Sequence, residues 1–137
     1  MRDGIDIEFR EVGMRDGLQN VDGFFPTKAK IAWMEAEIAT GMPAIEICSF
    51  VPPKLIPQFK DSVEVVEAAH AIDTGDCIIS ALIPNMKGAE RGVELGMKKL
   101  NFVASVSETH NLSNVRRKPE ESIEDFRRIV EMRDALP

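Results

Sequence analysis

Two adjacent charged residues, Arg15 and Asp16, follow a short alternating run that predicts a β-strand at about residues 5–12. The carboxylate of Asp16 can hold a hard divalent cation, because such cations prefer oxygen ligands. The guanidinium of Arg15 can stabilise negative charge that develops on a substrate oxygen. The alternative is a surface turn with an ion pair, because glycine and aspartate also form ordinary turns.

Further polar side chains interrupt or follow the later apolar runs of the chain. Glu46 lies inside a run that is otherwise apolar, and Asn85 comes shortly after another. Ser105, Ser107 and Glu108 follow the last such run. Each has a structural alternative, such as a buried ion pair for Glu46, a helix cap for Asn85 and a loop for Glu108. Their shared position favours one site, because ligands of parallel α/β sheets bind at the carboxyl ends of the strands.

Strand and helix signals alternate four times along the chain. Strands are predicted at about 5–12, 44–50, 77–83 and 99–105, and helices start near Pro26, near Asp61, at about residue 87 and at Pro119. The polar segments that end at Phe25 and that cover about 106–118 are predicted as loops. Such alternation predicts an α/β fold with a parallel sheet and right-handed crossovers.

Helix ends and helix faces carry more local signals. Thr27 is predicted to cap the first helix and Gly41 to end it. Asp61 and Glu64 have the spacing of a capping box for the second helix. Helical spacing predicts buried faces made of Ile31, Met34 and Ile38, of Val63, Val66 and Ala69 or His70, and of Ile123, Phe126 and Val130 with Ile129 beside them.

Composition argues against several classes of protein. The 137 residues are 44% hydrophobic and carry a net charge of −6, which suits one domain with a core and not a nucleic-acid binder. The basic run 116–118 is predicted to be solvated, with contact to phosphate groups as the alternative. No apolar run reaches the roughly 20 residues that span a bilayer, so no membrane is expected as a partner. Cys48 and Cys77 lie in apolar runs and are predicted to be reduced, as in a cytoplasmic protein.

Four segments, spread in order over the chain, combine charge, glycine and proline in a distinctive way. They are Glu11 to Asn20, which includes Arg15-Asp16-Gly17-Leu18-Gln19-Asn20, then Glu46 to Lys54, Pro84 to Gly88 and Ser105 to Asn111. Together these segments resemble the 3-hydroxy-3-methylglutaryl-CoA (HMG-CoA) lyase family. The resemblance implies a (β/α)8 TIM barrel, which takes about 250 residues when complete. Residues 1–137 are therefore predicted to be its first four β/α units, the N-terminal half of one catalytic domain without a separate second domain.

The resemblance also implies a reaction and a set of site residues. The reaction is cleavage of an acyl-CoA substrate, HMG-CoA, into acetoacetate and acetyl-CoA, with Mg²⁺ or Mn²⁺ and no organic cofactor. Asp16 resembles the metal ligand, Arg15 the catalytic arginine and Glu46 the catalytic glutamate that supports them. The substrate-binding residues carried over by position are Gln19, Ser49, Phe50, Asn85 and Ser107. Met14 departs from the family pattern, because many relatives have proline there.

Other features expected of the family are missing from the 137 residues. The resemblance implies a later His-x-His pair, an asparagine beyond it and a cysteine on a mobile loop, and neither His70 nor His110 matches that pair. One carboxylate with water would bind a divalent cation only weakly. The alternatives are a related acyl-CoA lyase, a Claisen-type synthase, or a non-catalytic half-barrel fragment or assembly module.

A half-barrel would leave its first and last strands without a neighbour on one side, and unpaired strand edges promote association. We expect the isolated 137-residue chain to form homo-oligomers, or to aggregate, through these edges. Light scattering at working concentration checks this, and a monodisperse monomer would contradict it. The chain is interpreted as a truncated product of a longer protein, and the alternative is a half-barrel that pairs with another chain.

Overall fold

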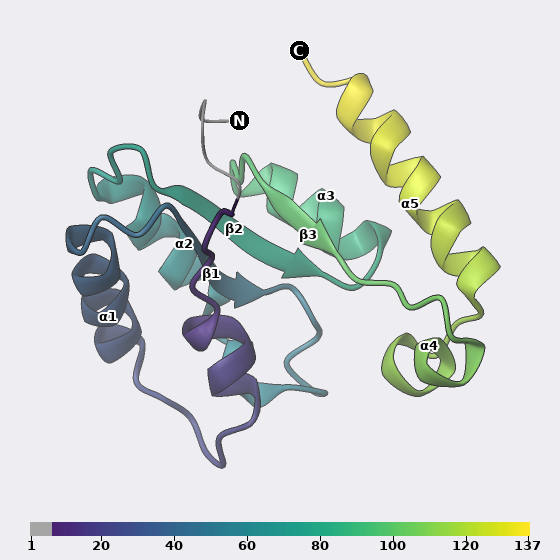
Figure 1. The fold of residues 1–137 in the computed structure, drawn as a ribbon, viewed down its shortest axis with the longest axis horizontal. Coiled ribbons are helices and arrows are strands. Elements are labelled where there is room, and N and C mark those ends of the chain that lie inside the picture. The colour runs from purple at the N-terminus through teal and green to yellow at the C-terminus, as the bar shows by residue number, and fades with distance from the viewer. Residues whose placement is uncertain (1–6) are drawn as a thin grey trace.

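The computed structural model describes residues 7–137 and contains a three-stranded parallel sheet with helices around it (Figure 1). The strands are β1 (Ala44–Ser49), β2 (Ile78–Ile83) and β3 (Leu100–Phe102), which pair in that order. Both pairs are parallel, so a long connection must carry the chain from each strand to the next. The predicted α/β class with a parallel sheet is confirmed, and the arrangement is consistent with part of a barrel.

The predicted fourfold repeat is only partly present. The strand expected at about 5–12 lies partly outside the described residues, and in the described part Glu11 forms a single parallel bridge with Ile45. This bridge consists of two backbone hydrogen bonds of 2.8 Å, from Glu11 N to Ala44 O and from Glu46 N to Glu11 O. The strand expected at 99–105 is shorter, since β3 ends at Phe102.

Five α-helices and two short turns of other helix types connect and cover the strands in the described part of the chain. The α-helices are α1 (Thr27–Ala39), α2 (Ser62–Ala71), α3 (Met86–Glu94), α4 (Glu108–Val115) and α5 (Pro119–Asp134). Figure 1 shows α2 and α3 behind the sheet and α5 on the far side of α3. Gly41 follows α1 with a φ of +79°, as the C-terminal glycine signal predicted. None of the helices in residues 7–137 is long and apolar enough to cross a membrane.

The hydrophobic core has two parts. The larger part joins β1 and β2 to α1 and α2, and its fully buried side chains include Met14, Met34, Ile45 and Val66. The smaller part joins β2, α3 and α5 through Ile83, Ala89 and Ile129. Every residue of β1 is buried, as is typical of a strand in a parallel sheet that is covered on both faces.

Two of the predicted helix caps do not form: neither Thr27 nor Asp61 makes a capping hydrogen bond through its side chain. Thr27 is the first residue of α1, and Pro26 occupies the cap position without a side-chain hydrogen bond. Asp61 does hold the cap position of α2, but it makes no capping hydrogen bond. Its carboxylate instead pairs with Lys30 at 2.6 Å, so a long-range ion pair replaces the predicted capping box with Glu64.

The two segments predicted as loops contain helices. The first includes the π-helical turn η1 (Gly13–Gly17), and the second contains α4. Asn111 of α4 is buried, and it donates hydrogen bonds of 2.8 Å to Arg117 O and Ser122 Oγ while accepting one from Ser105 N. A buried amide thus holds α4 in place, which is why the apolar pattern did not reveal this helix.

The buried faces of α2 and α5 also differ from prediction. On α2 the buried residues are Ser62, Val65, Val66 and Ala69, whereas Val63 is half-buried and His70 exposed. On α5 they are Ser122 and Ile129, whereas Ile123 and Phe126 are exposed and Val130 is half-buried. Polar contacts set the rotation of α5, because Ser122 faces Asn111 and Asp125 accepts a hydrogen bond from Met86 N at 3.1 Å.

Candidate active site

The turn η1 carries Arg15 and Asp16 and begins two residues after the Glu11 bridge. Val12 O accepts hydrogen bonds from Asp16 N at 2.6 Å and from Gly17 N at 3.4 Å, which gives the turn its wide π geometry. Met14 anchors the turn in the core, where it is fully buried. Single π turns are rare and occur frequently at functional sites.

Gly13 is the first residue of this turn, and the space around it is too small for a side chain. Its backbone N–H donates a 2.5 Å hydrogen bond to Glu11 Oε1. A Cβ atom at Gly13 would lie 2.7 Å from that oxygen and 2.9 Å from the Trp33 ring of α1. The close approach of η1 to α1 therefore requires glycine, and it fixes where Arg15 starts.

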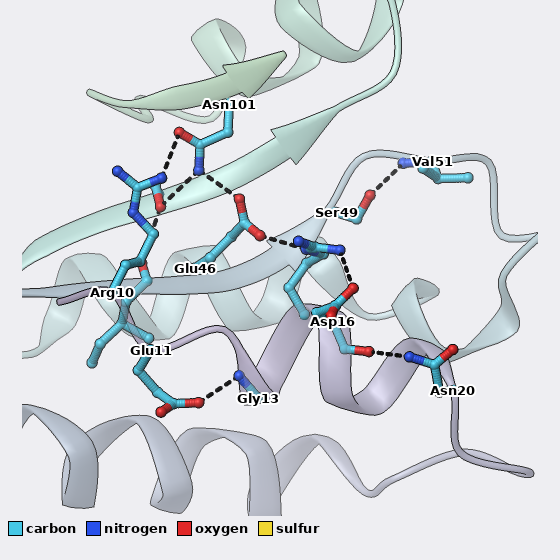
Figure 2. A network of polar contacts seen from close by, with 12 residues as sticks. Arg10, Glu11, Gly13, Asp16, Asn20, Glu46, Ser49, Val51 and Asn101 are labelled. Atoms are coloured by element: carbon cyan, nitrogen blue, oxygen red, sulfur yellow. Dashed lines mark hydrogen bonds and ion pairs between the residues drawn. The ribbon is translucent and has the colours of Figure 1, made fainter. Parts of the chain in front are cut away.

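Arg15, Asp16 and Glu46 form one connected ion-pair network. Arg15 Nε donates to Glu46 Oε2, and Arg15 Nη1 donates to Asp16 Oδ1 at 2.8 Å. The Glu46 side chain is 3% exposed, that of Arg15 16% and that of Asp16 55%. The network therefore runs from a buried glutamate to a carboxylate at the surface, and Figure 2 shows both ends of it. Sequence reasoning predicted these three residues as a site, and the structure brings them into contact.

A cavity of about 610 Å³ opens beside this network. Arg15, Asp16, Gln19 and Asn85 line it, together with residues 113–117 at the end of α4. Its other walls include Leu55 and Ile56 of the loop after β1. This volume lies in the range of small-molecule sites, about 300–1,000 Å³.

Three of the remaining predicted site residues, Ser49, Phe50 and Ser107, are not part of the cavity wall. Ser49 is buried and its Oγ accepts a hydrogen bond from Val51 N at 3.2 Å, while Phe50 packs against both parts of the core. Ser107 caps α4 by accepting from His110 N at 3.3 Å. Asn85 lines the cavity, but its Oδ1 also caps α3 by accepting from Gly88 N at 3.0 Å. The helix-cap interpretation of Asn85 is therefore confirmed, and a substrate contact by these residues stays a prediction.

Sequence reasoning missed Asn101, which lies in β3 and contacts Glu46. Its Nδ2 donates to Glu46 Oε1 at 2.5 Å, so both carboxylate oxygens of Glu46 are hydrogen-bonded. The signal for it was present, because Asn101 is a single polar residue between Leu100 and Phe102 in an apolar run. The same signal had identified Glu46.

A second hollow of about 600 Å³ lies at the opposite end of the strands. It is lined by the end of α2, the start of β2 and the segments before β2 and β3, with His70, Asp76, Cys77 and Lys99 among its residues. It contains no arginine and lies at the amino ends of the strands, where parallel sheets do not normally bind substrates. The cavity beside Arg15 is therefore the candidate active site.

Cys48 lies in β1 near Glu46 but has the properties of an inert core thiol. Burial raises the pKa of the Cys48 thiol to about 12, and burial also raises the pKa of Cys77. Neither cysteine is in a disulfide bond. A thiol with a raised pKa is a poor nucleophile at neutral pH, so Cys48 supports the fold and not the chemistry.

The Cys48 pKa predicts how stability changes in alkaline solution. An unfolded thiol ionises near pH 8.5, whereas the buried thiol stays protonated up to about pH 12. Its contribution to stability is therefore complete below about pH 8.5 and is lost as the pH rises from there towards 12, by up to about 1.4 kcal/mol per pH unit. Urea unfolding between pH 8 and 10 measures this loss. The loss should be smaller in Cys48→Ala, and an equal loss in both proteins would contradict the assignment.

Comparisons with known proteins agree with one another. The family model described as HMGL-like matches residues 6–135. The hydroxymethylglutaryl-CoA lyase YngG of Bacillus subtilis is 38% identical over 124 residues, which are 90% of this chain and 40% of the relative. The mitochondrial hydroxymethylglutaryl-CoA lyase of Arabidopsis thaliana is 37% identical over 121 residues, 88% of this chain and 25% of the relative.

A solved structure of similar fold is an HMG-CoA lyase from Acinetobacter baumannii in complex with coenzyme A and 3-methylmalate. It has a TM-score of 0.80 and 41% sequence identity, and the match covers 90% of this chain and 40% of that chain. The present chain thus spans between a quarter and two fifths of the length of these three relatives.

Proposed function

This chain belongs to the HMGL-like family, and from that premise we propose that it supplies the Arg15–Asp16–Glu46 part of a carbon–carbon lyase active site. The proposed reaction is cleavage of HMG-CoA into acetoacetate and acetyl-CoA. In this proposal, residues 1–137 form the N-terminal half of a TIM-barrel catalytic domain. The observation that carries the proposal is the ion-pair network of these three residues at the wall of a cavity large enough for an acyl group.

The hard step of this reaction is the departure of an enolate. The tertiary hydroxyl of the substrate loses its proton, its carbon becomes the ketone of acetoacetate, and the electron pair of the broken carbon–carbon bond moves to the acetyl-CoA fragment. Protonation of that fragment completes the balance. Negative charge develops on the thioester oxygen, where a fixed guanidinium stabilises it. This role of Arg15 is supported by its position in the cavity wall and by its ion pair with the buried Glu46.

Glu46 and Asp16 have different roles in the proposal. Glu46 is buried and both its oxygens are hydrogen-bonded, so it orients Arg15 and does not meet the substrate. Asp16 is exposed and lines the cavity, so in this proposal its carboxylate meets the substrate or a cation. The carboxylate and the guanidinium thus present opposite charges to one cavity.

The described residues do not complete a site for Mg²⁺ or Mn²⁺. Asp16 offers one carboxylate of the kind that these cations prefer. In residues 7–137 no group of three or more histidine, cysteine, aspartate or glutamate side chains is placed to hold a metal ion. The metal dependence implied by the resemblance therefore needs ligands beyond those described, and the roles of Arg15 and Glu46 do not depend on it.

Coenzyme A is the carrier group that the proposal assigns to the substrate. It is supported by the names of the relatives and by the bound coenzyme A of the A. baumannii enzyme. The relatives differ in cellular location, since they include a mitochondrial enzyme of A. thaliana and a cytoplasmic one of Danio rerio. For this chain the cytoplasm is the predicted location.

The incomplete metal site favours one alternative, a non-catalytic half-barrel that serves in assembly. Manganese titration followed by electron paramagnetic resonance separates the two functions. Tight binding by the natural gene product, lost in Asp16→Asn, would indicate a lyase metal site that includes Asp16. Binding that is absent or unaffected by Asp16→Asn would favour the assembly module.

A lyase assay on the natural gene product, paired with its intact mass, tests the proposed reaction directly. We expect cleavage of HMG-CoA that requires Mg²⁺ or Mn²⁺ from a product with the mass of a complete barrel. A product of 137 residues with no cleavage of HMG-CoA would contradict the proposal. A related acyl-CoA as the preferred substrate would keep the lyase class and change the assigned substrate.

A further inference from the structure

Asn101 makes side-chain contacts with three residues, and one of them is the glutamate that holds Arg15. Its Nδ2 lies 2.5 Å from Glu46 Oε1 and 3.1 Å from Ser80 Oγ. Arg10 Nη1 donates to its Oδ1 at 3.4 Å. Figure 2 shows the Asn101 side chain pointing from its strand towards Glu46, with the Arg10 guanidinium on its other side.

These contacts fix the orientation of the Asn101 amide. An asparagine amide has two N–H donors and one carbonyl acceptor. Both donors are used, by a carboxylate oxygen and by a hydroxyl oxygen, and the acceptor faces a guanidinium. The flipped amide would place its carbonyl oxygen against the Glu46 carboxylate, which is repulsive. Only one amide orientation therefore satisfies the surroundings.

Ser80 in turn fixes the position of Asn101 relative to the sheet. It is fully buried in β2, and its Oγ donates to Ile45 O of β1 at 3.2 Å. Ser80 is also the register partner of Glu46. Each of the three strands thus contributes one polar side chain to a connected group next to the Arg15–Glu46 ion pair. These side chains are Glu46, Ser80 and Asn101.

We infer that Asn101 is a positioning residue that sets the direction from which Glu46 meets Arg15. Its hydrogen bond restrains Oε1, and this leaves Oε2 turned towards Arg15 Nε. The second arm of Arg15 is held by Asp16, so the guanidinium is fixed at two points beside the cavity. This inference deepens the proposed function, because it rests on the role proposed there for Arg15.

Asn101 also has a backbone role in the sheet, which its side chain does not share. As a residue of β3 it pairs with Leu82 of β2 through the backbone ladder. The contacts of its side chain within the described residues are those to Glu46, Ser80 and Arg10. A substitution can therefore remove the amide while the backbone pairing stays.

The test measures the Arg15 Nε–H group by ¹⁵N–¹H NMR on the natural gene product that contains residues 1–137. An N–H that is held by a buried carboxylate exchanges slowly with water. In Asn101→Leu, which has similar volume but no donor, we expect exchange of the Arg15 Nε–H to become at least about tenfold faster. A change of that size corresponds to the loss of one hydrogen bond to a charged group. Asn101→Gln, which keeps the amide, should restore part of the protection.

Two controls separate positioning from a general loss of structure. The Arg117 guanidinium, which is paired with Asp125 and with Pro84 O, reports on the fold in the same spectrum. Glu131→Leu introduces a leucine at an exposed residue of α5, outside the cavity wall and without contact to Glu46. We expect the Arg117 signal to stay unchanged in every variant and the Arg15 signal to stay unchanged in Glu131→Leu.

The inference is overturned if the Arg15 Nε–H exchanges at the wild-type rate in Asn101→Leu, or if Arg15 and Arg117 lose protection together. The readout uses neither substrate nor metal. An absence of lyase activity would therefore contradict the proposed function and leave this result standing. Conversely, an unchanged Arg15 signal in Asn101→Leu would contradict the positioning role of Asn101. The proposed reaction would then still be tested by the lyase assay.

Discussion

Replacement of Lys30 by methionine is expected to lower the free energy of unfolding by about 3–5 kcal/mol, because it leaves a buried carboxylate without its partner. Lys30 Nζ lies 2.6 Å from Asp61 Oδ1 and donates to Gln58 O at 2.6 Å. Lys30 is 2% exposed and Asp61 5%, so water cannot replace the lost ammonium group. Asp61 Oδ2 is buried without a hydrogen-bond partner in the described residues, so Asp61 has little other compensation.

The Lys30 prediction is checked by urea unfolding of a double-mutant cycle. Lys30→Met with Asp61→Leu should recover most of the lost stability, because a buried ion pair and a well-packed apolar pair are often of similar stability. Arg91→Met, which breaks the exposed pair with Glu94 on α3, serves as the matched control and should cost no more than about 1 kcal/mol. A Lys30→Met cost as small as that of Arg91→Met would show that Asp61 is not confined as the structure indicates.

The Lys30–Asp61 pair also supports the candidate site. It joins α1 to the start of α2, and its bond to Gln58 O holds the short 3₁₀ turn η2 (Pro57–Phe59). The residues just before this turn, Leu55 and Ile56, form part of the cavity wall. Phe24 is held on the same side, because the Lys30 and Lys60 ammonium groups lie 4.5 and 4.0 Å from the centre of its ring. A buried ion pair thus fixes the loop that closes one side of the cavity.

Replacement of Arg15 by glutamine is expected to reduce the turnover number of the natural lyase by about 10²–10³-fold, because it removes a fixed donor at the developing enolate. The expected effect is on turnover more than on substrate affinity, since the charge on the thioester oxygen develops only in the transition state. Steady-state kinetics of HMG-CoA cleavage measure both quantities. Arg15→Lys keeps the positive charge but loses the planar fork that reaches Glu46 and Asp16 together, so we expect it to stay well below the wild type.

A stability measurement must accompany the Arg15 kinetics, because Arg15 also neutralises Glu46. Glu46 is 3% exposed, and when Arg15 is removed the one side-chain partner it keeps within residues 7–137 is Asn101. Thermal unfolding of each variant shows whether the protein is folded at the assay temperature. Arg127→Gln, at an exposed pair with Glu124 on α5, is a control that should leave both activity and stability unchanged. Folded Arg15→Gln with activity within about threefold of the wild type would refute the catalytic role.

The local pattern of the sequence was sufficient for β1, β2 and the helices α1, α2, α3 and α5, and for several of their ends. The apolar runs at about 44–50 and 77–83 became β1 and β2, and Gly41 ends α1 in a left-handed conformation. The four ordered motifs were sufficient for the family, which the family model and the relatives confirm. These features depend on residues that are close in sequence, so they can be predicted without knowledge of the packing.

Features that depend on polar contacts between residues distant in sequence could not be predicted from that local pattern. Asn111 stabilises α4 through a buried amide, so the segment 106–118 lacks an apolar stripe and was interpreted as a loop. Asp61 had the spacing of a capping box, but the ammonium group of Lys30 competes for its carboxylate. The face that α5 buries is set by Ser122 and Asp125, so the apolar stripe that included Ile123 and Phe126 was wrong.

By itself, then, the sequence determined the α/β class, the family and the candidate residues Arg15, Asp16 and Glu46. Only the tertiary structure decided how these residues are held. It placed Asn101 and Ser80 from two other strands below Glu46, and it formed the cavity from η1, the loop after β1 and the end of α4. The physical reason is that a charged side chain in a core is stable only where distant polar groups converge on it. That convergence depends on strand register and helix rotation, which are set by the packing of the whole fold.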